Sequence, residues 1–356
     1  MPGGPLDEML TIAERRDPAR GGSRSGYCID RIYEGGEALC IHNPATGREA
    51  TLPHVIARAD GPARTVVVVG AGPAGLEAAR VAAARGHRVV LFEAAPHPGG
   101  QLRRAAALAR RREIIGIVDW LQNEIQRLGV DLRCNLFAGA GDVLAEAPDV
   151  VVIATGGIPN TSFLAEGEEL AVTSWDILGG QAAPGRDVLL FDDNGAHPGA
   201  SCAEFLARAG ARLEFVTPER ALLPEIGGTN YPAYFKAFGE HGVVITLNRR
   251  LRAIRREGNQ VAAVLYDEYA RAFEERLVEQ VVIEHGTLPA DELYFELKPH
   301  SSNLGEIDLD ALLAGRPQSK VNNPDGSFQL FRVGDAVASR NIHAAIYDAL
   351  RLCKDL

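Results

Sequence analysis

The sequence predicts an α/β protein made of two doubly wound modules, with the second module inserted in the first. Three observations predict this fold. A strand–helix–strand pattern lies at residues 63–94, a second copy lies at residues 186–218, and residues 328–356 read as a strand, a turn and a helix, too few for a new domain. Short apolar strands that alternate with helical patterns are typical of parallel sheets, so each copy predicts a parallel sheet of its own.

The composition is that of a globular protein large enough for two domains. A chain of 356 residues exceeds the size at which a single core usually stops growing. Its formal charge of -10 comes from acidic residues spread along the chain, which disfavours broad binding to nucleic acid. The N-terminus lacks the apolar core of a signal peptide, and no apolar run approaches the roughly 18 residues that a membrane span needs. We therefore expect a cytoplasmic protein with no nucleic-acid or membrane partner.

The elements of the first module follow an arm that is rich in Gly, Pro and Arg. Ala63–Gly70 predicts a buried strand, Ala74–Gly86 a helix and His87–Ala94 a second strand, because β-branched runs and helical periodicity alternate there. A helix at Arg112–Gly129 and a strand at Asp149–Gly157 continue this module. The predicted boundaries are an arm at 1–60, a first domain at 61–160 and 325–356, and a second domain at 161–324.

The second module repeats the first with a helix of equal length. When Gly199 is laid on Gly75, Gly210 falls on Gly86, so both predicted helices run between glycines at matching positions. This match is an internal duplication of the strand–helix–strand unit.

The first module carries a glycine motif between its strand and its helix. Gly70, Gly72 and Gly75 form a G-x-G-x-x-G pattern, with Ala74 inside it. The first glycine allows a tight turn, the second lets the backbone approach a pyrophosphate, and the third lets helix and strand pack closely. Glu93 ends the next strand, where a carboxylate can accept hydrogen bonds from ribose hydroxyls. The motif predicts a ligand that contains ADP, and both NAD and FAD satisfy it.

Two further stretches favour FAD over NAD. The stretch "PGGQLRR" places Gly100, Gln101 and Arg103 soon after Glu93, and a Gly-Gly turn followed by arginines suits a loop near phosphates and a flavin ring. The stretch "VGDAVAS" places Asp335 at a strand end, where its carboxylate can bond a ribityl hydroxyl. The alternative for Asp335 is a plain helix N-cap.

At this point the sequence resembles the flavoproteins with two dinucleotide-binding domains and a glutathione-reductase-like fold. The resemblance rests on an "ATG" turn at Ala154, Thr155 and Gly156 and on a terminal "GD" pair at Gly334 and Asp335. It implies that these residues lie around bound FAD. It also implies that the second domain descends from one that binds NAD(P)H.

The second module lacks most of the residues that a dinucleotide needs. In the internal alignment Gly70 falls on Asn194, Gly72 on Ala196 and Glu93 on Thr217, while only Gly75 keeps a glycine partner. Asp192 and Asp193 also end the strand that should point at a pyrophosphate, and their charge would repel it. We therefore expect a degenerate, structural second domain without NAD(P).

Two cysteines near the start of the chain raise the question of a metal site. Cys28 and Cys40 are separated by eleven residues with a Gly-Gly pair between them, which permits a sharp turn. An all-cysteine 4Fe–4S cluster needs four thiolates, and two are not enough. The remaining cysteines lie in strand and helix patterns and read as buried small residues: Cys134, Cys202 and Cys353.

The sequence from Tyr27 onward resembles the C-terminal half of the trimethylamine dehydrogenase and 2,4-dienoyl-CoA reductase family, which includes N-methylproline and dimethylglycine demethylases. The resemblance rests on the cysteine segment, the glycine motif and the terminal "VGDAVASRNIHAAIYDALRL". In that family an FMN-bearing barrel precedes a 4Fe–4S segment. The resemblance implies that Cys28 and Cys40 match the third and fourth cluster ligands, whereas the first two would fall near Gly21 and Arg24.

Three explanations for the absence of cysteines at the first two ligand positions stay open. The chain is one subunit of a split enzyme whose separate FMN-barrel partner supplies the missing ligands, or it is a truncated copy, or it has lost the cluster and kept the flavin. The resemblance implies a flavin-dependent oxidoreductase or electron-transfer component of an N-methylated amine demethylase or dehydrogenase system. The alternative is a non-catalytic nucleotide-binding assembly subunit or a truncated remnant of such an enzyme.

Overall fold

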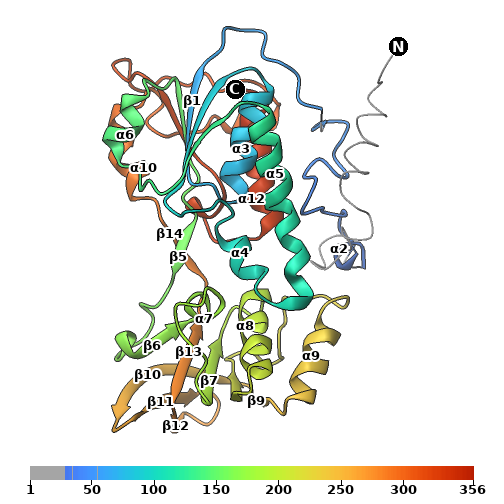
Figure 1. The fold of residues 1–356 in the computed structure, drawn as a ribbon, viewed down its shortest axis with the longest axis vertical. Coiled ribbons are helices and arrows are strands. Elements are labelled where there is room, and N and C mark those ends of the chain that lie inside the picture. The colour runs from blue at the N-terminus through green and yellow to red at the C-terminus, as the bar shows by residue number, and fades with distance from the viewer. Residues whose placement is uncertain (1–28, 34, 54) are drawn as a thin grey trace.

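The computed structural model describes residues 29–33, 35–53 and 55–356. It consists of two α/β domains joined by a narrow neck (Figure 1). The predictions made for residues 1–28, including the one for Cys28, lie outside the described residues. The first domain contains the N-terminal sheet strands and the C-terminal helix, while the second domain lies at the other end of the molecule (Figure 1). This arrangement confirms that the second module is inserted in the first.

The first domain is built on a parallel sheet of five strands in the order β15-β4-β1-β2-β3. The central strands are apolar and buried on both faces, as parallel strands covered by helices must be. The strands are β1 (Thr65–Val69), β2 (Arg88–Phe92), β3 (Asp131–Arg133), β4 (Val150–Ile153) and β15 (Gln329–Arg332).

Helices cover both faces of this sheet. Val66 and Val68 of β1 face one core, which includes side chains of α3 (Pro73–Ala84), α5 (Gly116–Arg127) and α12 (Ile342–Cys353). The alternate residues Val67 and Val69 face a second core, against α6 (Ala140–Ala145) and α10 (Glu292–Leu297). Because successive side chains of a strand point to opposite faces of the sheet, β1 contributes alternate side chains to the two cores.

The second domain has a parallel sheet of five strands in the order β6-β13-β7-β8-β9. The helices α8 (His197–Arg208) and α9 (Tyr231–Glu240) cover one face, and a three-stranded antiparallel sheet covers the other. Helices α3 and α8 each contain 12 residues, which confirms the equal lengths predicted by the internal alignment. The strands are β6 (Ala171–Thr173), β7 (Asp187–Asp192), β8 (Arg212–Val216), β9 (Val244–Thr246), β10 (Arg249–Glu257), β11 (Gln260–Asp267), β12 (Ala272–Val278) and β13 (Gln280–Glu284).

The remaining helices are short. They are α2 (Asp30–Tyr33), α4 (Gln101–Ala105), η1 (Ala109–Ile115), η2 (Glu168–Leu170), α7 (Ser174–Leu178), η3 (Lys298–His300), α11 (Leu309–Leu313) and η4 (Gly334–Ala336). No helix in the described part of the chain combines the length and the apolar character needed to cross a bilayer.

The neck between the domains consists of β5 (Gly157–Pro159) and β14 (Thr287–Pro289), which pair antiparallel. After β14 the chain has already returned to the first domain, because Tyr294 and Leu297 of α10 pack into the core beneath β1 and β4. The sequence predicts that residues 290–324 belong to the second domain, whereas in the structure α10, which lies in this range, packs on the sheet of the first domain. The return therefore comes about 35 residues earlier than expected.

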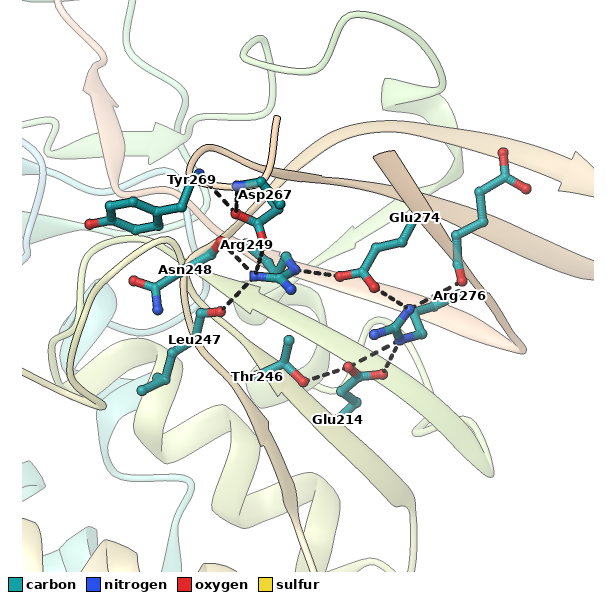
Figure 2. Close-up of polar contacts among 11 residues, drawn as sticks. Glu214, Thr246, Leu247, Asn248, Arg249, Asp267, Tyr269, Glu274 and Arg276 are labelled. Atoms are coloured by element: carbon teal, nitrogen blue, oxygen red, sulfur yellow. Dashed lines mark hydrogen bonds and ion pairs between the residues drawn. The ribbon is translucent and has the colours of Figure 1, made fainter. Parts of the chain in front are cut away.

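A network of ion pairs joins the antiparallel sheet to the parallel sheet of the second domain (Figure 2). Arg249 pairs with Asp267 at 2.8 Å and with Glu274, and Arg276 bridges Glu274 at 3.3 Å and Glu214 at 3.2 Å. The hydrogen bond from Arg249 lowers the pKa of the Glu274 carboxyl. The network therefore fixes β10 and β12 against β8.

Arg249→Ala is expected to destabilise the protein by about 1.5–3 kcal/mol, because it removes several charge-assisted hydrogen bonds from a half-buried site. The lowered pKa of Glu274 means that this stabilisation is present at neutral pH and is lost as the pH falls through that pKa. Urea unfolding at pH 7 and pH 3.5 measures both effects. The control is Arg250→Ala, which removes a single pair with Glu268 and is expected to cost less than about 0.5 kcal/mol.

Candidate nucleotide-binding site

The turn between β1 and α3 accepts only glycine at two of its positions. Gly70 has a φ of +100°, and a Cβ added there would lie 2.4 Å from the carbonyl oxygen of Ala154. A Cβ at Gly75 would lie 1.7 Å from the carbonyl oxygen of Gly70. The first and third glycines of the motif therefore hold the helix close against the strand.

Gly72 differs from the other two because nothing of the protein lies within 4 Å of the position of its added Cβ. It is the N-cap of α3, with Pro73 next in the helix and no acidic residue in the first turn. The positive end of the helix dipole is therefore not compensated by an acidic side chain of the helix itself. We call this open turn, residues 70–75, the cradle. It fits a pyrophosphate.

Glu93 lies beside this turn, immediately after β2. Its carboxylate accepts hydrogen bonds from the backbone N–H of Ala71 at 2.7 Å and of Ala95 at 2.8 Å. These two bonds orient the carboxylate and use one lone pair on each oxygen, so each oxygen can still accept a bond from a hydroxyl.

The Gly-Gly turn predicted to lie near phosphates packs directly against the glycine motif. The Gly99 N–H donates to the carbonyl oxygen of Ala71 at 2.8 Å, and a Cβ at Gly100 would lie 3.2 Å from the Cα of Gly72. Arg103 donates from Nε to the carbonyl oxygen of Pro98 at 2.6 Å, so one edge of its guanidinium group stabilises the turn itself. Contact of Gly100 or Arg103 with a phosphate stays a prediction.

Asp335 lies in η4. Gln101 donates from Nε2 to Oδ2 of Asp335 at 3.0 Å, and the Arg340 N–H donates to Oδ1 at 3.1 Å. Burial raises the pKa of the Asp335 carboxyl. The N-cap of α12 is Asn341, whose side chain accepts from the N–H of Ala344, so the alternative role of Asp335 as the N-cap of the closing helix is wrong.

The terminal "GD" pair meets the glycine motif through Ala74. Gly334 has a φ of +65°, and a Cβ added to it would lie 2.8 Å from the Cβ of Ala74. Residues 265 positions apart in the chain, Gly70 and Asp335, are thereby brought to the same helix end. Ala74 therefore packs closely against Gly334, and its contact with a cofactor stays a prediction.

The "ATG" turn leads from the sheet into the neck. The Ala154 N–H donates to Val69 at 2.8 Å, the Thr155 hydroxyl donates to the carbonyl oxygen of Ala290, and the Gly156 carbonyl accepts from the Ala290 N–H at 3.0 Å. The turn therefore ties the outgoing chain to the returning chain. A contact between these residues and a cofactor stays a prediction.

The corresponding turn of the second domain contains a buried carboxyl group. Asp192 is fully buried, accepts from the N–H groups of Asn194 at 2.9 Å and Gly195 at 3.2 Å, and leaves Oδ2 without a partner among the described residues. A Cβ at Gly199 would lie 2.5 Å from that oxygen, so the carboxyl group sits under the first turn of α8. Ala196 is the N-cap of α8, where the first domain has Gly72.

Asp192 and Glu284 are paired across neighbouring strands β7 and β13. Burial is the main cause that raises the pKa of Asp192 well above its usual range, and the charge of Glu284 adds to it. Burial also raises the pKa of Glu284. This turn does not reproduce the phosphate cradle of the first domain, because Ala196 carries a Cβ at the N-cap position where the first domain has Gly72.

Cys40 packs against the closing helix of the first domain. Its Sγ accepts from the N–H groups of His42 and Asn43, each at 3.4 Å. His343 donates from Nδ1 to the Cys40 carbonyl at 2.9 Å, because its Nε2 must accept from Arg48 at 3.2 Å.

The described residues contain no group of three or more His, Cys, Asp or Glu side chains that could hold a metal ion, so they do not by themselves fit an iron–sulfur cluster. Cys202 and Cys353 are buried, as expected, and burial raises the pKa of both thiols. Cys134 is only half-buried.

The sequence analysis missed a polar cluster at the start of α8. Arg111 lies 2.8 Å from His197 through Nη1 and Nδ1, and the hydroxyl of Tyr234 lies 3.0 Å from the same His197 nitrogen. His197 is the first residue of α8. Its neighbour Pro198 was the available signal, since proline is enriched in the first turn of helices.

Comparisons with known proteins agree with this geometry. The family described as an NAD(P)-binding Rossmann-like domain matches residues 68–117. The chain is 54% identical over 345 residues to a probable N-methylproline demethylase of Rhizobium meliloti (strain 1021), covering 97% of this chain and 51% of that protein. It is 48% identical over 343 residues to N,N-dimethylglycine/sarcosine dehydrogenase of Chromohalobacter salexigens, covering 93% and 49%. The chain spans about half the length of the curated relatives it matches.

A solved structure also matches almost the whole chain. Histamine dehydrogenase from Rhizobium sp. 4-9 superimposes with a TM-score of 0.77 at 25% identity, covering 96% of this chain and 49% of that one. The predicted fold class is thereby confirmed. The chain is a two-domain α/β protein with a Rossmann-like first module, and nearly its whole length is similar to about half of each of these two proteins, which are named as a probable N-methylproline demethylase and an N,N-dimethylglycine/sarcosine dehydrogenase.

Proposed function

We propose that the first domain binds FAD and that the chain is a flavin-dependent oxidoreductase or electron-transfer component acting on N-methylated amines. The observation that carries this proposal is the convergence of the open cradle at Gly72 with the half-buried carboxyl group of Asp335, through Gly334 and Gln101. The names of the two relatives, which are an N-methylproline demethylase and a dimethylglycine/sarcosine dehydrogenase, support the substrate class.

The residues of the cradle have distinct roles in this proposal. The amide groups after Gly72 bind the pyrophosphate at the positive end of α3, and Glu93 accepts from the ribose hydroxyls. Asp335, oriented by Gln101, bonds the ribityl chain. The flavin, when bound, supplies the electron chemistry, while the protein orients it and sets its electrostatic surroundings.

We further propose that the chain acts with a separate FMN-barrel subunit in the cytoplasm and does not use NAD(P). A 4Fe–4S cluster would need ligands from that partner beside Cys28 and Cys40.

The absorption spectrum of the purified full chain tests the proposal. We expect flavin bands, and we expect that denaturation releases FAD in a ratio near one per chain. A colourless protein that releases ADP would contradict flavin chemistry and support the alternative of a nucleotide-binding assembly subunit. Rapid bleaching of the flavin by NADH would contradict the proposed absence of an NAD(P) site.

A further inference from the structure

One segment of the first domain reaches across to the second domain. Residues 101–115, which form α4 and η1, descend from the Gly-Gly turn to α7 and α8 before the chain turns back into α5 (Figure 1). Three arginines of this segment contact the second domain: Arg104, Arg110 and Arg111. We call residues 101–115 the crossing segment.

Arg110 holds a buried carboxylate of α8. Its Nε donates to Glu204 at 2.8 Å, and Glu204 is completely buried. The guanidinium also lies 4.0 Å above the ring of Tyr234 in α9. Arg208 of α8 bonds the other oxygen of Glu204 at 2.9 Å, so one carboxylate joins an arginine from each domain.

Arg111 is 4% exposed and reaches the first turn of α8. Arginine can only donate, so Nδ1 of His197 accepts from Nη1 at 2.8 Å and carries no proton. The hydroxyl of Tyr234 lies 3.4 Å from the same Nη1 and 3.0 Å from Ser201. The cluster thus joins the crossing segment to both helices of the second domain.

The other end of the crossing segment touches the cradle of the first domain. Gln101 is the first residue of α4 and bonds Asp335, while Arg104, one turn later, lies 4.4 Å above the ring of Trp175 in α7. Both contacts are therefore made by a single helix of five residues, α4.

We propose that the crossing segment is a latch that locks the second domain to the first and couples its position to the Gln101–Asp335 pair. Side chains of this latch also occupy the first turn of α8, where a dinucleotide phosphate would need free amide groups. The second domain is then a fixed support of the cradle. The coupling depends on the proposed function only in the measurement of FAD affinity. The measurement of hydrogen exchange is independent of that function.

The test compares hydrogen exchange in the ligand-free full chain. In a variant with Arg110→Ala and Arg111→Ala, we expect exchange in residues 197–208, 101–105 and 334–341 to quicken at least about fivefold, and FAD affinity to fall about tenfold. Arg127→Ala is the control, because Arg127 is exposed on α5 and pairs with Glu124 of the same helix. It is expected to leave all three segments unchanged.

Tyr234→Phe is the second variant, used in case the double variant does not fold. It removes the hydroxyl shared by Arg111, His197 and Ser201 and keeps the ring. Faster exchange confined to residues 197–208 would overturn the coupling, and unchanged exchange in every segment would overturn the latch. Exchange needs no cofactor, so a wild-type chain that binds no FAD would contradict the proposed function and leave the latch to be judged by exchange alone.

Discussion

Gly75→Ala is expected to destabilise the first domain by about 4 kcal/mol or more. The added Cβ would lie 1.7 Å from the carbonyl oxygen of Gly70 and 3.2 Å from the Cβ of Ala154. The first of these atoms is backbone, so the overlap is relieved only if α3 moves away from β1. That movement would separate helix and strand side chains that are almost completely buried. Urea unfolding followed by circular dichroism measures the loss.

The matched control replaces the neighbouring glycine of the same motif. Gly72→Ala meets no protein atom within 4 Å and has a φ of -70°, which alanine adopts readily, so we expect a stability change below about 0.5 kcal/mol. Its methyl group would occupy the approach of a pyrophosphate, and we expect the affinity for ADP and FAD to fall at least about tenfold. If Gly72→Ala binds ADP like the wild type, the cradle is not the phosphate site.

Asp192→Asn is expected to stabilise the second domain by about 1–3 kcal/mol at pH 8. Asp192 is completely buried, and its Oδ2 has no partner among the described residues. An asparagine keeps the acceptor for the N–H groups of Asn194 and Gly195 and is neutral at every pH, so folding no longer requires a buried acid beside Glu284 to bind a proton. Thermal and urea unfolding at pH 8 measure the gain.

The same substitution is expected to flatten the dependence of stability on pH. Burial raises the pKa of Asp192 in the folded protein, whereas in the unfolded chain it ionises near pH 4. Between these two pKa values the folded state binds more protons, so the free energy of unfolding falls as the pH rises. Asp187→Asn, in an exposed pair with Arg212 at the start of the same strand, is the control. A slope unchanged by Asp192→Asn would mean that Asp192 is ionised when folded.

The sequence predicts the parallel cores well because local signals specify them. The runs of valine in β1 and β4 and the glycines that end β1 depend on residues close in the chain. The position of α10 could not be predicted in this way. Its apolar residues Tyr294 and Leu297 would suit either domain, and only the early return through β14 brings them to the first sheet.

The cradle was predictable for the same reason, but its surroundings were not. Glycine spacing identifies the turn before α3, since Gly70 has a φ of +100°, a conformation that favours glycine. The contact of Arg111 with His197 joins residues 86 positions apart, and neither carries a periodic or motif signal. Such contacts follow from how two domains meet, which the order of strands and helices does not determine.

The neck of β5 and β14 has a consequence for the order in which the protein forms during synthesis. The second domain enters and leaves through this neck, and all strands of its sheet lie between residues 171 and 284. Strand β15 and helix α12 emerge from the ribosome only afterwards, and β15 forms the edge of the first sheet beside β4. The inserted domain can therefore fold on the nascent chain while the domain that begins first must wait for the last residues to be made.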